Sequence, residues 1–208
     1  MSFPELEAFV EECTAVDDTL AAITPEAWDR PALGTWNMAQ LVAHLVRAPT
    51  RVTAYLPEPV PDEPVVDRVE YFRFDADAEA AGVAQRAVSE AAAVEASSLP
   101  GRFSVGWRAS AAAAADHGPA QLLATFRGPM RLDEYLSTRV LECVVHHIDV
   151  RVALDLPPAA TPAAARMTME ILEGLLGESR PRNMGRTRFI QAATGRLATD
   201  DPRFPVLH

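Results

Sequence analysis

Cysteine, positive charge and long apolar runs are all scarce in this sequence of 208 residues. The two cysteines, Cys13 and Cys143, lack the spacing of a disulfide framework, so we expect reduced thiols that fill positions in the core. No uncharged apolar stretch reaches the roughly 18 residues of a membrane span, and the acidic N-terminal sequence lacks the features of a signal peptide. These absences together predict a cytoplasmic protein.

The charge balance argues against two classes of partner. The formal net charge is −10, and no run of basic residues occurs. Proteins that bind nucleic acid or anionic membranes usually carry a positive surface, so we expect neither partner. Hydrophobic residues make up 49% of the chain, and its length suffices for one domain with a full core. The expected partners are small molecules, and the sequence leaves open whether the chain forms a homodimer.

Residues 132–154 predict the helix around which the domain is built. This segment is apolar on almost every side when read as a helix, which is typical of a helix in the middle of a domain. One narrow face carries polar side chains at helical spacing: Tyr135, Arg139, Glu142, His146 and Asp149. Buried ionisable groups are costly unless they are paired or bind a metal, so this stripe marks the candidate site.

Glu142 and His146 lie one helical turn apart and point the same way, as two metal ligands would. Asn37 is a predicted N-cap with Gln40 at the third helical position, and the helix that follows places His44 on its inner face. A single inner-face histidine is more often a hydrogen-bonded core residue. Antiparallel packing of the two helices would nevertheless bring all three side chains to one level. Two imidazoles and one carboxylate suit Zn²⁺, Ni²⁺ or Fe²⁺, and three protein ligands leave open coordination positions, as in catalytic sites.

The other polar residues near this site admit more than one interpretation. Arg139 could hold an anionic group of a substrate or pair with Glu142. Asp149 could orient a metal ligand or form a hydrogen bond to another helix. Arg139 and Asp149 are therefore the candidate catalytic residues. His147 points away from this face and is expected in the core or an interface, whereas His117 lies beside a glycine–proline break and is expected in solvent.

Apolar periodicity and helix-stop residues predict the remaining helices. They are expected at residues 3–23, 38–56, 75–97, 162–176 and 189–196. Leu99-Pro100-Gly101 is expected to stop the third of these, and residues 102–130 predict a short extended segment followed by one or two short helices. Residues 25–36 and 57–67 are rich in proline and predict irregular connections.

Two segments resemble the signature helices of a known family. TWNMAQLVAHLVRA and MRLDEYLSTRVLECVVHHIDVRVALDLPP are similar to the N-terminal domain of mycothiol-dependent maleylpyruvate isomerase, which belongs to the DinB/YfiT-like superfamily. The resemblance implies an all-α fold in which residues 1–156 form an up-down-down-up four-helix bundle. Residues 157–208 would then be a C-terminal helical extension packed on the same domain. The resemblance also implies that His44, Glu142 and His146 bind a divalent metal.

The resemblance further implies chemistry with a low-molecular-weight thiol such as mycothiol. A metal ion favours the thiolate, which is the nucleophile. The leading hypothesis is therefore a metal-dependent S-transferase or isomerase that acts on a small electrophile, with zinc favoured over nickel and iron. The isomerase has a separate C-terminal domain where this chain has only residues 157–208, so the substrate stays open. The alternatives are a non-catalytic bundle that binds a metal or ligand, and a non-haem iron oxygenase with the same ligand types.

Overall fold

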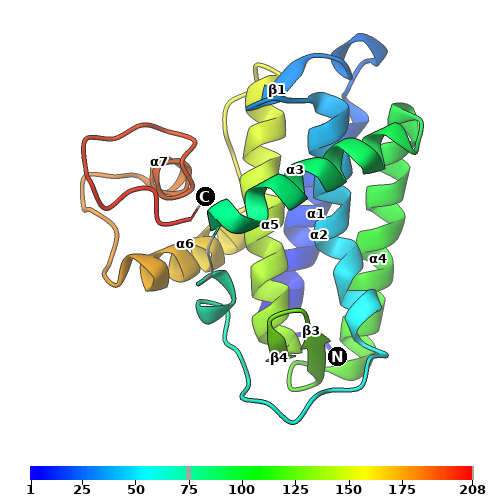
Figure 1. The fold of residues 1–208 in the computed structure, drawn as a ribbon, viewed down its shortest axis with the longest axis vertical. Coiled ribbons are helices and arrows are strands. Elements are labelled where there is room, and N and C mark those ends of the chain that lie inside the picture. Colours follow the sequence, from blue (N-terminus) through cyan, green and yellow to red (C-terminus); the bar gives the residue numbers. More distant parts are fainter. Residues whose placement is uncertain (74–75, 208) are drawn as a thin grey trace.

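Four long helices pack side by side and run the length of the molecule (Figure 1). The computed structural model describes residues 1–73 and 76–207, with side chains described outside residues 76–81. The bundle consists of α1 (Pro4–Ala21), α2 (Met38–Tyr55), α4 (Leu99–His117) and α5 (Leu132–Ala153). Along the chain these helices run up, down, down and up in the view of Figure 1. The predicted all-α four-helix bundle is confirmed.

Helix α5 is the most deeply buried helix of the bundle, as its sequence predicts. It packs against α1, α2 and, beyond the bundle, α6 (Pro162–Leu176). Most of its 22 residues are buried, and the buried residues include Arg139, His146 and Asp149. These charged groups interrupt the apolar surface of α5. Among the described residues, no helix is long and apolar enough to cross a membrane.

A short β hairpin and a capping box precede α2. Strands β1 (Pro31–Leu33) and β2 (Trp36–Asn37) pair in antiparallel fashion, where the sequence predicted an irregular connection. Asn37 Oδ1 accepts a hydrogen bond from the backbone N–H of Gln40, and Gln40 Oε1 accepts one from the backbone N–H of Asn37, both at 3.0 Å. This reciprocal pair is the predicted capping box. It fixes the first turn of α2, about two turns before His44.

The rest of the two proline-rich connections is largely irregular, as predicted. The first connection contains the 3₁₀ turn η1 (Pro25–Ala27), which precedes β1. The second is followed by the 3₁₀ turn η2 (Glu70–Phe72). The second turn brings Tyr71 and Phe72 into the core, where both side chains are buried. The long connection that follows α2 is therefore anchored near its end by two aromatic side chains.

The prediction for the segment that begins at residue 99 is wrong. Leu99-Pro100-Gly101 does not stop a helix but begins α4, which continues without a break to His117. Proline is favoured in the first helical turn, because the backbone N–H groups there have no acceptor within the helix and the absence of one costs no hydrogen bond. The preceding helix, α3 (Ala76–Ala92), ends earlier than predicted and is followed by the 3₁₀ turn η3 (Ala96–Ser98). Helix α3 lies outside the bundle and crosses it against α2 (Figure 1).

A second β hairpin occupies the segment between α4 and α5. Strands β3 (Leu122–Thr125) and β4 (Gly128–Arg131) pair in antiparallel fashion, and β3 replaces the end of the predicted helical segment. The turn of this hairpin carries Phe126 and Arg127, which line a pocket beside α2 and α5. His117, at the end of α4, is exposed, as predicted.

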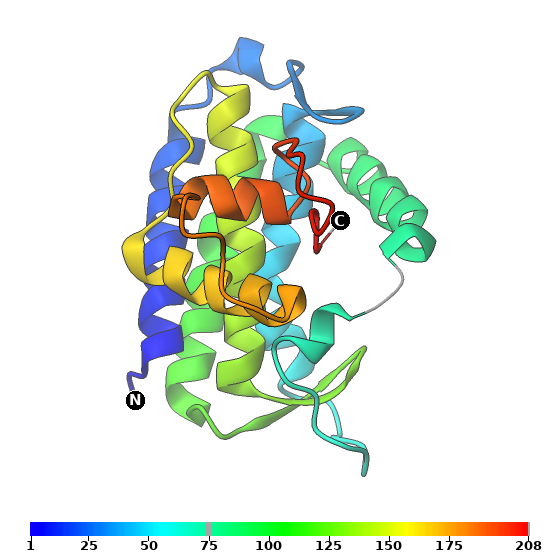
Figure 2. The same cartoon turned by 90° about the vertical axis from the view of Figure 1, so that its left-hand side faces the viewer.

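Two helices after the bundle cover one side of α5 (Figure 2). Helix α6 packs against α5 and α1, and its bounds match the predicted residues 162–176. Gly177 ends it in the left-handed conformation, with a φ of +80°, which glycine adopts without strain. Helix α7 (Arg186–Ala193) packs on α6 and begins earlier than the predicted residues 189–196.

A buried polar network links α1, α5 and the start of α6. Glu12 is fully buried, and its carboxyl oxygens accept hydrogen bonds from His147 Nδ1 and from the backbone N–H of Thr161, both at 2.7 Å. The other ring nitrogen of His147, Nε2, lies 2.8 Å from Thr19 Oγ1. His147 is thus a core residue, as predicted, whereas the sequence pointed to no role for Glu12.

The two cysteines meet in the core between α1 and α5. Cys13 and Cys143 are both free and fully buried, and their Sγ atoms lie 3.9 Å apart. Burial, assisted by the contact with Cys143, raises the pKa of the Cys13 thiol well above its usual range. Because the thiolate is the reactive form of cysteine, this environment favours two unreactive thiols.

We expect both thiols to stay reduced and protected in the folded protein. A thiol reagent such as 5,5′-dithiobis(2-nitrobenzoate) should react slowly with the native chain and should titrate both cysteines rapidly after denaturation. The physical reason is burial, which excludes the reagent and disfavours the thiolate. Peptide mapping of the native protein without reductant provides the second measurement. A Cys13–Cys143 disulfide in that map would contradict the prediction.

Candidate metal site and adjoining pocket

The three predicted metal ligands lie together between α2 and α5. One ligand atom from each of His44, Glu142 and His146 lies within 4.8 Å of the others. The rings of His44 and His146 meet edge to face with centroids 4.7 Å apart, and Trp36 packs on His44 with centroids 5.1 Å apart. Helices α2 and α5 run antiparallel, which brings the three side chains to one level (Figure 1). The structure thus assembles the donor set that the sequence predicted.

His146 is held so that its Nε2 atom faces Glu142. Its Nδ1 lies 3.0 Å from Asp149 Oδ2, about one turn further along α5, and its Nε2 lies 3.5 Å from Glu142 Oε2. A histidine that donates its Nδ1–H to a carboxylate keeps the Nε2 lone pair for a metal. Asp149 therefore occupies the position of a residue that orients a metal ligand.

The electrostatics favour forms of these side chains that bind a cation. Burial, together with nearby His146, lowers the pKa of His44 to about 3, so its imidazole is uncharged at neutral pH. Burial alone would raise the pKa of Glu142, but the hydrogen bond from His146 and the charge of Arg139 outweigh it and lower that pKa to about 2. Burial likewise opposes the charge on His146, yet hydrogen bonds to Asp149 and Glu142 raise its pKa. The site therefore stabilises positive charge near Nε2 of His146.

Arg139 lies next to the site without pairing with Glu142. Its Nε donates to Thr138 Oγ1 at 3.1 Å, and its Nη2 donates to Tyr71 Oη at 3.2 Å. The guanidinium also stacks over the ring of Tyr135, 4.8 Å from the centroid. Within the described part of the chain, no carboxylate forms an ion pair with Arg139. Of its two interpretations, the geometry favours a cation that remains available to an anionic group.

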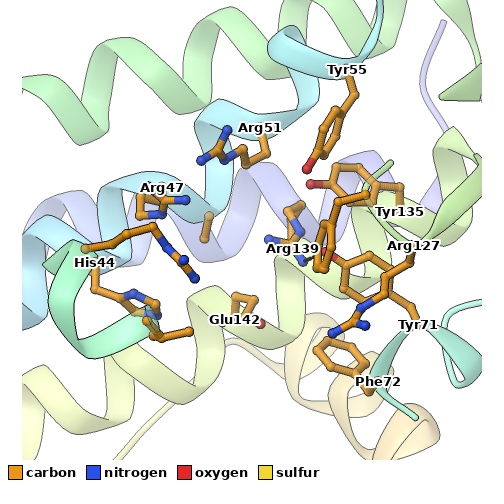
Figure 3. Close-up of a pocket in the computed structure, with 14 residues that line it drawn as sticks. His44, Arg47, Arg51, Tyr55, Tyr71, Phe72, Arg127, Tyr135, Arg139 and Glu142 are labelled. Atoms are coloured by element: carbon orange, nitrogen blue, oxygen red, sulfur yellow. Dashed lines mark hydrogen bonds between the residues drawn. The ribbon is translucent and has the colours of Figure 1, made fainter. Parts of the chain in front are cut away.

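A pocket of about 470 Å³ opens beside these residues (Figure 3). His44 and Glu142 belong to its lining, so the predicted metal site faces the pocket. Aromatic side chains form part of the wall: Tyr55, Tyr71, Phe72, Phe126 and Tyr135. Arginines form much of the remainder: Arg47, Arg51, Arg86, Arg127 and Arg139. A small molecule held near the metal ligands would contact both groups.

Arg196 contacts the candidate site, which the sequence did not reveal. It follows α7 and reaches back to α5, where Nε donates to Asp149 Oδ1 at 3.2 Å and Nη2 donates to Asp149 Oδ2 at 3.0 Å. Asp149 thus joins His146 to a segment outside the bundle, and its second partner comes from the chain after α7 rather than from another helix. No local pattern pairs two residues that lie 47 positions apart in the sequence.

We expect Arg196→Gln to weaken zinc binding about tenfold. Substitution of residues that orient a metal ligand through hydrogen bonds typically lowers metal affinity by about 10- to 100-fold. The amide cannot hold both oxygens of Asp149, so His146 loses part of its orientation. Competition with a zinc chelator measures the affinity, and Arg196→Lys should restore part of it. Arg203→Gln is the control, because Arg203 bonds to Asp201 and not to Asp149. Equal affinities of Arg196→Gln and the unmodified protein would contradict the prediction.

Comparison with known proteins adds the family. No curated protein and no solved structure matches the chain. A protein-family model, the mycothiol maleylpyruvate isomerase N-terminal domain, matches residues 9–151, a span that contains all three predicted metal ligands and ends before α6. This match covers more than half of the 208 residues. The chain therefore belongs to the mycothiol maleylpyruvate isomerase N-terminal domain family.

Proposed function

We propose that this protein is a metal-dependent enzyme that adds a low-molecular-weight thiol to a small electrophile, by S-transfer or as a step of isomerisation. One observation carries the proposal. Ligand atoms of His44, Glu142 and His146 lie within 4.8 Å of one another, at a pocket of about 470 Å³. Three protein ligands leave coordination positions for a substrate, and the pocket has room for it.

The chemistry of the donor set fits a divalent cation. Two imidazoles and one carboxylate suit zinc, which we propose as the metal, with nickel and iron as alternatives. The low pKa values of His44 and Glu142 support this assignment, because both side chains are already in their ligand forms at neutral pH. Asp149 supports it as well, since it fixes the ring of His146 through Nδ1.

The proposed co-substrate is mycothiol or a similar thiol, in line with the family's description. A free thiol has a pKa of about 8.5 and is mostly protonated at neutral pH. A divalent cation at this site would supply the positive charge that favours the thiolate. Arg139 would place a second positive charge in the pocket wall, beside the electrophile. We place the reaction in the cytoplasm, where the two free cysteines would stay reduced.

The proposal is tested by metal loading followed by a thiol assay. The purified chain is stripped with a chelator and reloaded with zinc, nickel or iron, and its metal content is measured. We expect about one ion per chain from the three-ligand site. Turnover of 1-chloro-2,4-dinitrobenzene, or of a panel of small electrophiles, should then require both metal and mycothiol.

The other outcomes separate the competing functions. Stoichiometric metal without thiol-dependent turnover of any electrophile would support a bundle that binds a metal or ligand without catalysis. Oxygen consumption by the iron form alone would support an oxygenase. Metal content that does not depend on His44 and His146 would overturn the site itself. His117→Ala is the matched control, because His117 is exposed at the far end of α4 and should not affect metal content.

A further inference from the structure

Arginine is concentrated in one pocket of an acidic protein. The sequence has no lysine, so all 19 of its basic residues are arginines, against 29 acidic residues. Five arginines nevertheless line the pocket beside the metal ligands: Arg47, Arg51, Arg86, Arg127 and Arg139. Among the described lining residues, Glu142 is the only carboxylate. The pocket thus carries the opposite charge to the molecule as a whole.

The helices arrange these groups in a defined order. His44, Arg47, Arg51 and Tyr55 follow one another along α2, and Glu142, Arg139 and Tyr135 follow in the same direction on α5. At one end the His44 and His146 rings meet, and at the other the Tyr55 and Tyr135 rings meet with centroids 5.6 Å apart. The arginines therefore lie between the metal ligands and an aromatic end. With a rise of about 1.5 Å per residue, Arg51 lies about 10 Å along α2 from His44.

Among the residues that the structure describes, no carboxylate pairs with Arg51 or Arg139. Arg47 forms an ion pair with Glu90 of α3. Within the described ranges, Arg139 donates hydrogen bonds to hydroxyl groups and stacks on aromatic rings, and Arg51 makes no hydrogen bond or ion pair. Both side chains belong to the lining of the pocket (Figure 3). Guanidinium groups that line a concave pocket without a counter-ion are typical of sites that bind carboxylate or phosphate.

An unpaired hydroxyl group in the same wall points to the same kind of ligand. Tyr135 is fully buried, and its hydroxyl has no hydrogen-bond partner in the part of the chain that the structure describes. Figure 3 shows this hydroxyl and that of Tyr55 on the side facing Arg51 and Arg139. Burial raises the pKa of Tyr135, so the phenol keeps its proton and can donate it. A ligand oxygen placed among these donors would satisfy the hydroxyl.

We propose that this pocket binds an oxyanion, a carboxylate or phosphate group, through Arg51, Arg139 and the hydroxyl of Tyr135. The inference rests on the proposed function in one respect: the oxyanion would belong to the electrophile, whose reactive end lies near His44 and Glu142. The pocket then selects electrophiles that carry an anionic group one to two helical turns away from the reacting atom. The aromatic end would accept an apolar or planar part of the same molecule.

Binding of small probes to the full chain tests the proposal. Isothermal titration in a chloride buffer compares phenyl phosphate and benzoate with benzyl alcohol, a neutral molecule of similar size. We expect at least one of the two anions to bind more than about tenfold tighter than the alcohol, the effect of one or two charge-assisted hydrogen bonds. The stronger anion identifies the natural group as phosphate or carboxylate. Each titration is made on both the metal-free and the zinc-loaded protein.

Two variants locate the binding in the pocket. Arg51→Gln should weaken binding of the preferred anion about tenfold, whereas Arg166→Gln, the same charge change at an exposed position of α6, should not. Tyr135→Phe removes only the hydroxyl. It should weaken binding of the preferred anion by about three- to tenfold. The melting temperature should stay the same or rise, because the hydroxyl has no partner among the described residues.

The outcomes separate this inference from the proposed function. Anion binding to the metal-free protein that depends on Arg51 would support the pocket even if no metal or thiol activity were found. Equal affinities for anions and alcohol, or anion binding that Arg51→Gln and Tyr135→Phe leave unchanged, would overturn the pocket. Metal-dependent thiol turnover could persist in that case, with substrates that carry no anionic group.

Discussion

Glu142→Gln is expected to remove the bound metal and abolish thiol-dependent turnover while leaving the fold intact. Glu142 supplies the only anionic ligand of the predicted site, and its carboxyl group, with a pKa of about 2, is ionised at neutral pH. Glutamine keeps the shape of the side chain but removes that charge. We expect metal affinity to fall by more than about 100-fold. Substitution of a residue that only orients a metal ligand can already lower the affinity by that factor.

The stability of the same variant separates a metal ligand from a structural residue. The side chain of Glu142 is 26% exposed, and no ion pair joins it to Arg139 among the described residues. The substitution therefore breaks no ion pair with Arg139, and we expect the metal-free protein to stay folded with a loss of at most about 3 kcal/mol, the free energy that corresponds to a carboxyl pKa lowered to about 2. Metal analysis and thermal unfolding of the metal-free form provide the two measurements. Full metal content combined with a large loss of stability would end the metal-site hypothesis.

The metal ligands could be predicted because local signals define both helices that carry them. The capping box of Asn37 and Gln40 fixes the start of α2, and helix geometry then sets the position of His44. The spacing of Glu142 and His146 alone places both on one face of α5. What the sequence could not show is that the two faces meet. That conclusion depended on the resemblance to a known family. Two segments that lie far apart in this chain are each similar to a helix of the same bundle in that family.

The segment before α5 was misread because its local signals are ambiguous. Pro100 and Gly101 are as typical of a helix stop as of a first turn, and the alanines that follow define no apolar face. In the structure, Phe103 and Trp107 lie one turn apart and are buried in the bundle. The apolar run around Leu123 is too short to distinguish strand from helix by periodicity. Its pairing with the strand before α5 settles it as a hairpin.

The rest of the site depends on contacts between distant segments. Arg47 and Arg51 look like ordinary solvated positions of an amphipathic helix, and only the packing of α3, α5 and the β3–β4 turn encloses them. Arg196 reaches Asp149 from beyond the part of the chain that the family model matches. A local sequence pattern cannot predict either arrangement, because it depends only on residues within one or two helical turns of each other.

Glu12→Ala is expected to cause the largest loss of stability of any polar substitution considered. The carboxyl group is fully buried and accepts hydrogen bonds from His147 Nδ1 and the backbone N–H of Thr161. Alanine leaves both donors without a partner inside the core, where an unsatisfied donor costs about 1–3 kcal/mol. Removal of one partner of a buried charged network typically costs about 3–5 kcal/mol, and we expect a loss in that range.

The position of Glu12 makes the effect specific to the junction of bundle and extension. Its two partners lie on α5 and at the N-cap of α6, so the substitution should also loosen α6. Urea unfolding gives the free energy, and hydrogen exchange of α6 amides reports the local opening. Glu11→Ala is the matched control, since Glu11 is the exposed neighbour on α1 and removes the same charge. Equal stability of the two variants would show that the buried network contributes nothing, because the substitutions differ only in burial and hydrogen bonding.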